Sequence, residues 1–197
     1  MMNVAVWGIG SHAEKNTIPA ISEARGVNLG GLLSRDIHKS KRLAEQYDCA
    51  HWESPEEMLT DHSINCVYIA SPVSKHFKQT MSALKSGKHV LCEKTLTEDH
   101  GKAVELFSYA RKKQLLLFEC LMYLHHQQFK TLQSLLAAGE IGEPFTITSR
   151  FGFPHLETEN IRYRKDLGGG ASLDAGVYPL SAIFALLRDC LLYTSPS

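Results

Sequence analysis

A glycine-containing turn close to the N-terminus constrains the fold of this chain more than any other feature. The turn, Gly8-Ile9-Gly10-Ser11-His12-Ala13, follows the apolar run Asn3–Trp7 and precedes an amphipathic segment from Glu14 to Arg25. A G-x-G-x-x-G/A turn between a strand and a helix is typical of βαβ units that bind a dinucleotide. This part of the chain therefore predicts a strand, a phosphate-binding turn and a helix.

The small residues of the turn have separate physical roles in such a site. Gly8 permits the tight turn, Gly10 lets the backbone approach the pyrophosphate, and Ala13 allows the helix to pack closely on the strand. Backbone amides around Ser11 and His12 and the positive end of the helix dipole attract the phosphates. We expect these five residues to contact the cofactor.

Short apolar runs alternate with longer amphipathic segments after this turn, a pattern typical of a parallel sheet covered by helices. Asp36 and Ser54 are natural helix N-caps, and Gly87 is a natural helix end. The expected strands are 3–7, 27–33, 66–70, 89–92 and 115–118, and the expected helices are 14–25, 37–47, 55–59, 74–86 and 98–113. The fold class is therefore α/β, with a Rossmann-type doubly wound sheet.

The pattern changes after this sheet. A helix is expected over 127–138, a strand over 145–151, a long loop over 152–172 and a helix over 174–187. We expect a dinucleotide-binding domain over residues 1–121, the start of a second, α+β domain over 122–188, and an atypical tail over 189–197.

Composition excludes several classes of partner. Lys plus Arg and Asp plus Glu both number 21, so no net charge favours nucleic acid or an anionic membrane. No apolar run reaches the ~20 residues that span a bilayer, and no signal peptide is evident, so we expect a cytoplasmic protein. The five cysteines form no C-x-x-C pair, so we expect free thiols and no metal site.

The residues that end the second expected strand indicate which nicotinamide cofactor is preferred. Ser34-Arg35 stands where NAD-specific enzymes carry a carboxylate for the ribose 2′-hydroxyl, and arginine suits a 2′-phosphate. We expect NADP(H) to be preferred, with NAD(H) as the alternative that nearby Asp36 keeps open. Lys39, one turn later, could add charge, but we expect it to belong to a solvated helix face.

Three later segments resemble the Gfo/Idh/MocA family of oxidoreductases. In the first, Gly87–Lys94, a strand ends in Glu93-Lys94, and the resemblance implies that both residues contact the cofactor, with Lys94 at the nicotinamide. The family has proline after this lysine, whereas this chain has Thr95. Because non-proline peptides strongly prefer trans, we expect a trans Lys94–Thr95 bond.

The second segment, Ala70–His76, resembles the family's loop beside the nicotinamide ribose, which implies cofactor contacts from Ser71, Pro72 and His76. The third, Gly168–Pro179, resembles the family's substrate-facing motif, in which an aspartate is followed four residues later by a histidine or tyrosine. The resemblance assigns these places to Asp174 and Tyr178, and a helix would put both on one face.

Within the family, the chain is most similar to nucleotide-sugar 3-ketoreductases of deoxysugar biosynthesis. Two segments carry this resemblance, Met122–Gln128 and Asn160–Arg164, although Gln127 stands where proline is usual. It implies a sugar substrate, most simply a nucleotide-linked keto sugar. The weaker substrate-site candidates in and beside these segments are Tyr123, His125, His126, Arg162 and Tyr163.

The implied reaction needs a proton donor for the developing alkoxide. We expect Tyr178 to be that donor and Lys94 to be its cationic partner, with Glu93 and Asp174 orienting the pair. One alternative is a dehydrogenase of a free sugar, an inositol or a dihydrodiol. An alternative of another class is a non-catalytic NADP(H)-sensing regulator, since fold does not fix function.

The end of the chain departs from the resemblance. Relatives of this family continue into an antiparallel sheet that covers the active site and forms homo-oligomers, whereas this chain stops at Ser197. We expect a C-terminally truncated reading in which 189–197 is foreign to the family. An open substrate pocket would leave this chain by itself inactive.

Overall fold

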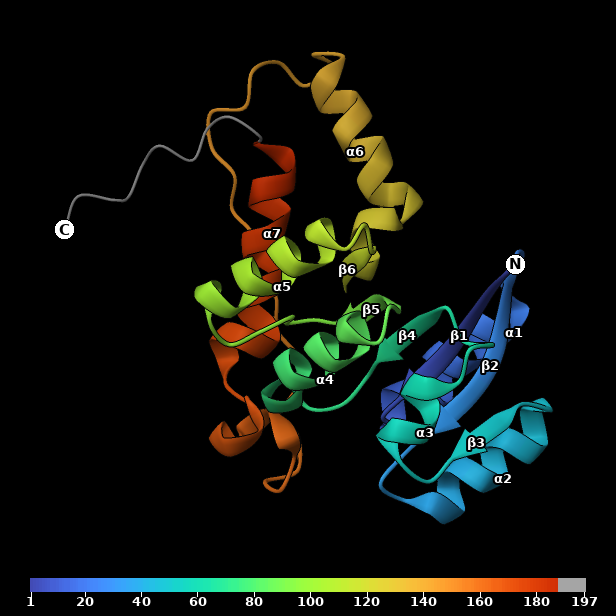
Figure 1. The fold of residues 1–197 in the computed structure, drawn as a ribbon. Coiled ribbons are helices and arrows are strands. Elements are labelled where there is room, and N and C mark those ends of the chain that lie inside the picture. Colours follow the sequence, from blue (N-terminus) through green and yellow to red (C-terminus); the bar gives the residue numbers. More distant parts are fainter. Residues whose placement is uncertain (188–197) are drawn as a thin grey trace. The chain divides into compact units, whose positions relative to one another are not determined.

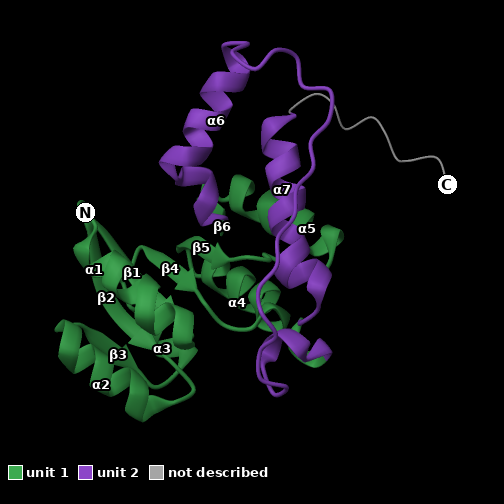
Figure 2. Ribbon diagram, turned by 180° about the vertical axis from the view of Figure 1, so that it is seen from behind, with its two compact units in different colours: residues 1–120, 166–168 green, residues 121–165, 169–197 purple. Residues whose placement is uncertain are grey.

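The computed structural model describes residues 1–187, and the tail at 189–197 lies outside the described residues. The chain divides into two compact units, which Figure 2 colours separately. Unit 1 comprises residues 1–120 and 166–168, and unit 2 comprises 121–165 and the residues from 169 onward.

Unit 1 is built on one parallel sheet of six strands in the order β3-β2-β1-β4-β5-β6 (Figure 1). Two βα runs extend in opposite directions from the central pair β1 and β4, which is the doubly wound arrangement that the sequence predicted. The strands are β1 (Met2–Trp7), β2 (Val27–Leu33), β3 (Ala50–Trp52), β4 (Cys66–Ile69), β5 (His89–Glu93) and β6 (Leu117–Cys120).

Alternation along β1 creates two cores, because successive side chains of a strand point to opposite faces of the sheet. Val4 and Val6 pack with α1 and α2, whereas Ala5 belongs to the core under α3, α4 and α5. The helices are α1 (Ile18–Glu23), α2 (Ile37–Tyr47), α3 (Pro55–Thr60), α4 (Val73–Lys85) and α5 (His100–Lys112), and a π-helical turn, η1 (Ala13–Thr17), precedes α1.

Local sequence signals fix where several of these helices begin and end. The Asp36 carboxylate accepts a hydrogen bond from the Lys39 amide, and Ser54 caps α3 in the same way. Gly87 adopts a φ of 75° just after α4, a conformation that residues with a Cβ rarely adopt. Both predicted caps and the predicted helix end are confirmed.

Unit 2 is helical and irregular over its described residues. Its larger helices are α6 (Gln127–Ala137) and α7 (Val177–Leu186), and its shorter turns are η2 (Met122–His125), η3 (Ile161–Tyr163), η4 (Lys165–Leu167, shared with unit 1) and η5 (Ser172–Gly176). Across residues 1–187, no helix is long and apolar enough to cross a membrane.

Three expectations about secondary structure are corrected. The segment 145–151 forms no strand, because none of the described residues lies beside it as a hydrogen-bonded partner strand. The helix expected from Asp174 begins earlier, as the π-helical turn η5, and becomes α-helical at Val177. The short strand β3 was not predicted, because three residues carry no readable alternation.

Candidate dinucleotide and substrate site

The expected cofactor residues of unit 1 gather at one edge of its sheet. Because the strands are parallel, the residues that follow β1, β2, β4 and β5 all lie at the carboxyl ends of the strands. Gly8, Ser34 and Lys94 directly follow β1, β2 and β5, and Ser71 is the second residue after β4. Dinucleotides bind at this edge in open α/β sheets, at the point where the strand order reverses.

The two glycines of the first turn are needed for different reasons. Gly8 has a φ of 100°, and a Cβ there would lie 2.8 Å from the Ser71 amide nitrogen. Gly10 has no atom within 4 Å of its Cβ position, so the space above it is open. Ser11 and His12 are exposed, whereas Ala13 is buried where the helix meets the sheet. The turn therefore fits a pyrophosphate against its backbone.

The end of β2 carries no carboxylate. Ser34 accepts a 3.2 Å hydrogen bond from the Asp36 amide, and the Arg35 side chain is exposed. The Asp36 carboxylate is committed to the α2 cap, 2.9 Å from the Lys39 amide. This edge therefore leaves an arginine and a serine, rather than an acid, for the 2′-position of the adenine ribose.

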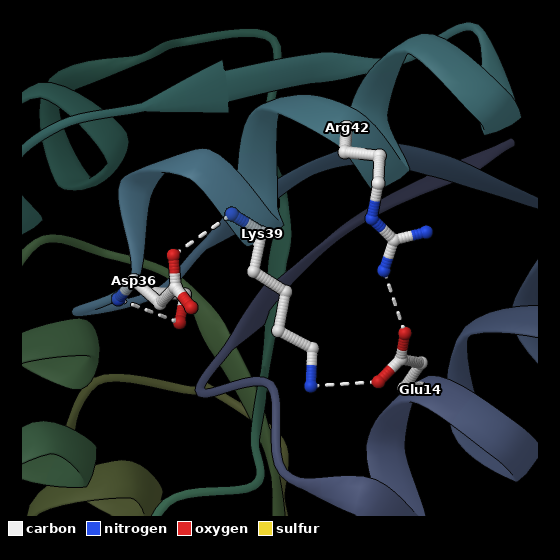
Figure 3. Close-up of polar contacts among 5 residues, drawn as sticks. Glu14, Asp36, Lys39 and Arg42 are labelled. Atoms are coloured by element: carbon white, nitrogen blue, oxygen red, sulfur yellow. Dashed lines mark hydrogen bonds and ion pairs between the residues drawn. The ribbon is translucent and has the colours of Figure 1, made fainter.

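A carboxylate from the neighbouring helical turn lies beside this edge. Glu14 contacts Lys39 at 2.6 Å through one oxygen and Arg42 at 2.8 Å through the other (Figure 3). Hydrogen bonds from these two cations lower the pKa of Glu14. Lys39 is thus an ion-pair partner and not only part of a solvated helix face, which the sequence pattern alone did not reveal.

His76 links the loops that follow β4 and β5. It is 1% exposed, and its Nδ1 and Nε2 lie 2.8 Å from the carbonyl oxygens of Thr95 and Ser71, respectively. Burial lowers the pKa of His76, and the two carbonyls with Glu93 and Glu119 oppose this effect. The buried ring therefore contacts both connections, and in its neutral form it donates one hydrogen bond to one of the two carbonyls.

The Lys94–Thr95 peptide bond is cis, so the expected trans bond is wrong. Tertiary contacts surround this bond on both sides. The Thr95 carbonyl lies against His76, and the Leu96 amide donates a 2.7 Å hydrogen bond to Glu119. These non-local partners, rather than the residue type at 95, define the local backbone.

Glu93 is the last residue of β5, and its carboxylate lies beside the first turn. It accepts a 2.5 Å hydrogen bond from the Tyr68 hydroxyl, and its carboxylate lies 3.6 Å from His12 Nε2. Burial raises the pKa of Tyr68 well above its usual value, so Tyr68 remains a neutral donor. Glu93 is therefore held by Tyr68 of β4 and lies beside His12 of the first turn, and half-buried Lys94 follows it in the sequence.

In unit 2, Tyr178 belongs to an aromatic cluster. Its ring centroid lies 4.5 Å from that of Phe151 and 6.1 Å from that of Tyr123. The Tyr123 hydroxyl donates a 2.8 Å hydrogen bond to Ser181 of α7. The contact with Phe151 was not predicted, because no spacing in the sequence connects residues so far apart.

Asp174 lies four residues before Tyr178 and is paired with an arginine. Arg162 Nε contacts Asp174 Oδ2 at 2.9 Å, and the guanidinium lies over the Phe153 ring at 5.5 Å. The structure therefore joins two residues that the sequence had placed in separate motifs. Arg162 is thus the ion-pair partner of Asp174.

The remaining substrate candidates also lie in unit 2. His126 caps α6 through a 3.2 Å hydrogen bond from the Gln128 amide, and His125 is exposed in η2. The Tyr163 hydroxyl lies 3.3 Å from His155 Nδ1, and the two rings stack. Lys94 and Tyr178 fall in different units.

Comparisons with known proteins agree with this geometry. Residues 2–120 match the model of an oxidoreductase family with an NAD-binding Rossmann fold, Gfo/Idh/MocA. Residues 129–190 match the C-terminal domain model of the same family.

Individual relatives are similar over three quarters of this chain or more. A dTDP-3,4-didehydro-2,6-dideoxy-alpha-D-glucose 3-reductase from Saccharopolyspora spinosa is 38% identical over 92% of this chain and 54% of its own length. A D-xylose 1-dehydrogenase (NADP(+)) from Hypocrea jecorina is 35% identical over 75% of this chain and 40% of its own length.

Among solved structures, a 3-ketoreductase from Actinomadura kijaniata in complex with NADP and TDP-benzene superposes with a TM-score of 0.89. It is 35% identical, and the match covers 94% of this chain and 57% of that one. This chain thus spans about half the length of the relatives it matches. The family model covers more than half of this chain, so the chain belongs to the Gfo/Idh/MocA family of oxidoreductases.

Proposed function

We propose that this chain is part of an NADPH-dependent reductase that acts on a keto group of a nucleotide-linked sugar. The observation that carries the proposal is the Glu93-Lys94 end of β5 beside a dinucleotide turn, in a chain 38% identical to a dTDP-sugar 3-reductase. Residues 122–188 would then begin the substrate domain. We further propose a cytoplasmic homo-oligomer whose partner is a small-molecule sugar.

The preference for NADP(H) follows from charge at the end of β2. Ser34 and Arg35 follow the strand, and Asp36 is used by its own helix cap. A 2′-phosphate therefore meets an arginine instead of a repelling carboxylate. The A. kijaniata relative was solved with NADP, which supports the same choice.

Two residues of this chain would supply the proton and the positive charge that a ketone reduction needs. When bound, the reduced nicotinamide supplies a hydride to the carbonyl carbon. Tyr178 gives its phenolic proton to the carbonyl oxygen, so the ketone becomes an alcohol and solvent reprotonates the phenolate. Lys94 lowers the cost of forming that phenolate through its positive charge.

Neighbouring side chains prepare both groups for this role. Phe151 and Tyr123 pack around the Tyr178 ring and restrict its orientation. Glu93, held by Tyr68, precedes Lys94 on the same strand end. Such fixed surroundings reduce the reorganisation that a proton transfer requires.

The test is NADPH oxidation by the full-length protein with dTDP-3,4-didehydro-2,6-dideoxyglucose. Tyr178→Phe removes the proton but keeps the ring, so kcat should fall ~10²–10⁴-fold with little change in NADPH affinity. Lys94→Ala should lower kcat as well. Tyr109→Phe, on α5, is the matched control and should keep full activity.

Other substrates distinguish this proposal from its alternatives. Turnover of D-xylose or a dihydrodiol, with the nucleotide-linked ketone refused, would replace the substrate and keep the proton donor. Full activity of Tyr178→Phe would instead disprove the assigned donor. Tight NADPH binding without turnover of any of these compounds would favour a cofactor-sensing regulator.

A further inference from the structure

Glu14 connects the phosphate-binding turn to α2 through two cations. Its two carboxylate oxygens are divided between Lys39, at 2.6 Å, and Arg42, at 2.8 Å. Figure 3 shows both basic side chains reaching from α2 toward Glu14. The carboxylate has a lowered pKa and is ionised at neutral pH.

The ion pairs of Glu14 with Lys39 and Arg42 are connected to the end of β2 through the cap of α2. The Asp36 amide donates to Ser34 Oγ at 3.2 Å, and the Asp36 carboxylate accepts from the Lys39 amide at 2.9 Å. A surface hollow at this place is lined by residues of both signs, Glu14, Asp36, His38, Lys39 and Arg42. The two cations paired with Glu14 therefore border the place of the 2′-phosphate.

Glu14 and a 2′-phosphate would compete for the same two cations, Lys39 and Arg42. Lys39 and Arg42 retain N–H donors beyond those used by Glu14, so both can reach a second anion. An ionised carboxylate repels a phosphate dianion placed beside it. The two anions also compete for the same N–H donors. NADH has no 2′-phosphate and experiences neither effect.

We propose that Glu14 is a specificity-determining residue whose carboxylate engages Lys39 and Arg42 and thereby limits the affinity for NADPH without affecting NADH. This inference rests on the proposed use of NADP(H). Glu14 sets how strongly the chain distinguishes the two cofactors, while Ser34 and Arg35 set which one it prefers.

The experiment measures dissociation constants of NADPH and NADH for the wild-type chain and for Glu14→Gln. Glutamine keeps the size of the side chain and removes its charge, so NADPH should bind roughly tenfold more tightly. NADH should change less than about twofold. The gain should shrink as ionic strength rises, because it is electrostatic.

Two further variants separate this mechanism from a general change in charge. Glu45→Gln makes the same change of net charge at an exposed position of α2, and it should leave both constants unchanged. Adding Lys39→Met to Glu14→Gln should remove most of the gain, since the freed ammonium provides it.

The outcomes are distinguishable. If the wild-type chain prefers NADPH but Glu14→Gln binds NADPH no more tightly than the wild type does, the role of Glu14 is disproved. The cofactor proposal then stands. An equal gain in Glu45→Gln also disproves it. If the wild-type chain binds NADH as tightly as NADPH, the cofactor proposal fails, and the inference about Glu14 fails with it.

Discussion

At the scale of single residues, the two glycines of the first turn differ in whether the fold requires them. Gly8 is required by the backbone itself, since its φ of 100° and the Ser71 amide leave no place for a Cβ. Gly10 is not required by the fold, because nothing occupies its Cβ position. The same Gly8-Ile9-Gly10 segment thus contains one glycine that the backbone requires and one that the described fold does not require.

This difference predicts opposite results for two alanine substitutions. Gly8→Ala should lower the free energy of unfolding by ~1–3 kcal/mol, because alanine is strained at this φ and meets backbone atoms. Gly10→Ala should leave that free energy nearly unchanged while weakening NADPH binding at least tenfold, because its methyl group occupies the phosphate's approach. Urea unfolding and NADPH titration measure the two effects. Equal destabilisation by both variants would contradict this assignment.

At the scale of elements, the position of Lys94 depends on a link between two strand connections. Lys94 follows β5, and the next residue, Thr95, is joined through His76 to Ser71 after β4. Because the histidine is on α4, the helix and both connections share one buried side chain. The position of Lys94 is therefore a property of this group of elements rather than of β5 alone.

Removing the link should cost both stability and affinity. His76→Ala removes a fully buried ring that lies against the part-buried carbonyls of Ser71 and Thr95, so the free energy of unfolding should fall by ~2–5 kcal/mol. NADPH should also bind more weakly, because the segment that carries Lys94 is released. The adjacent exposed residue provides the control, and Lys75→Ala should change neither quantity. An unaltered unfolding midpoint in His76→Ala would refute the role of the link.

At the scale of the whole molecule, the two units carry different parts of the proposed chemistry. Unit 1 contains the dinucleotide turn, Ser34-Arg35 and Lys94, whereas unit 2 contains Tyr178 and the Arg162–Asp174 pair. Both tryptophans, Trp7 and Trp52, belong to unit 1. Their fluorescence therefore reports the unfolding of the dinucleotide-binding unit specifically.

Cofactor binding should stabilise that unit by mass action. With NADPH at about 100 times its dissociation constant, the free energy of unfolding of unit 1 should rise by about 2.7 kcal/mol. Tryptophan fluorescence follows this unfolding. NADPH should produce little gain in Gly10→Ala, which retains the fold but lacks the binding surface. A fluorescence transition that NADPH does not shift in the wild-type chain would show that unit 1 does not bind it.

Much of unit 1 was predictable because its signals are local. The bounds of β2 and α2 follow from apolar alternation, from a cap at Asp36 and from helical spacing, all within a few residues of one another. The family resemblance added Lys94, Asp174 and Tyr178 as candidates in the same way, from short motifs. Segment 145–151 shows the limit, since a strand also needs a neighbour to pair with.

The sequence by itself determined the alternating elements of the sheet, the phosphate-binding turn and the residues at the ends of its strands, because each depends on nearby residues. Tertiary structure alone decided the cis Lys94–Thr95 bond, the division of Glu14 between Lys39 and Arg42, and the packing of Tyr178 against Phe151. These features join groups from separate elements. Their geometry exists only once packing brings distant parts of the chain within hydrogen-bond or van der Waals distance.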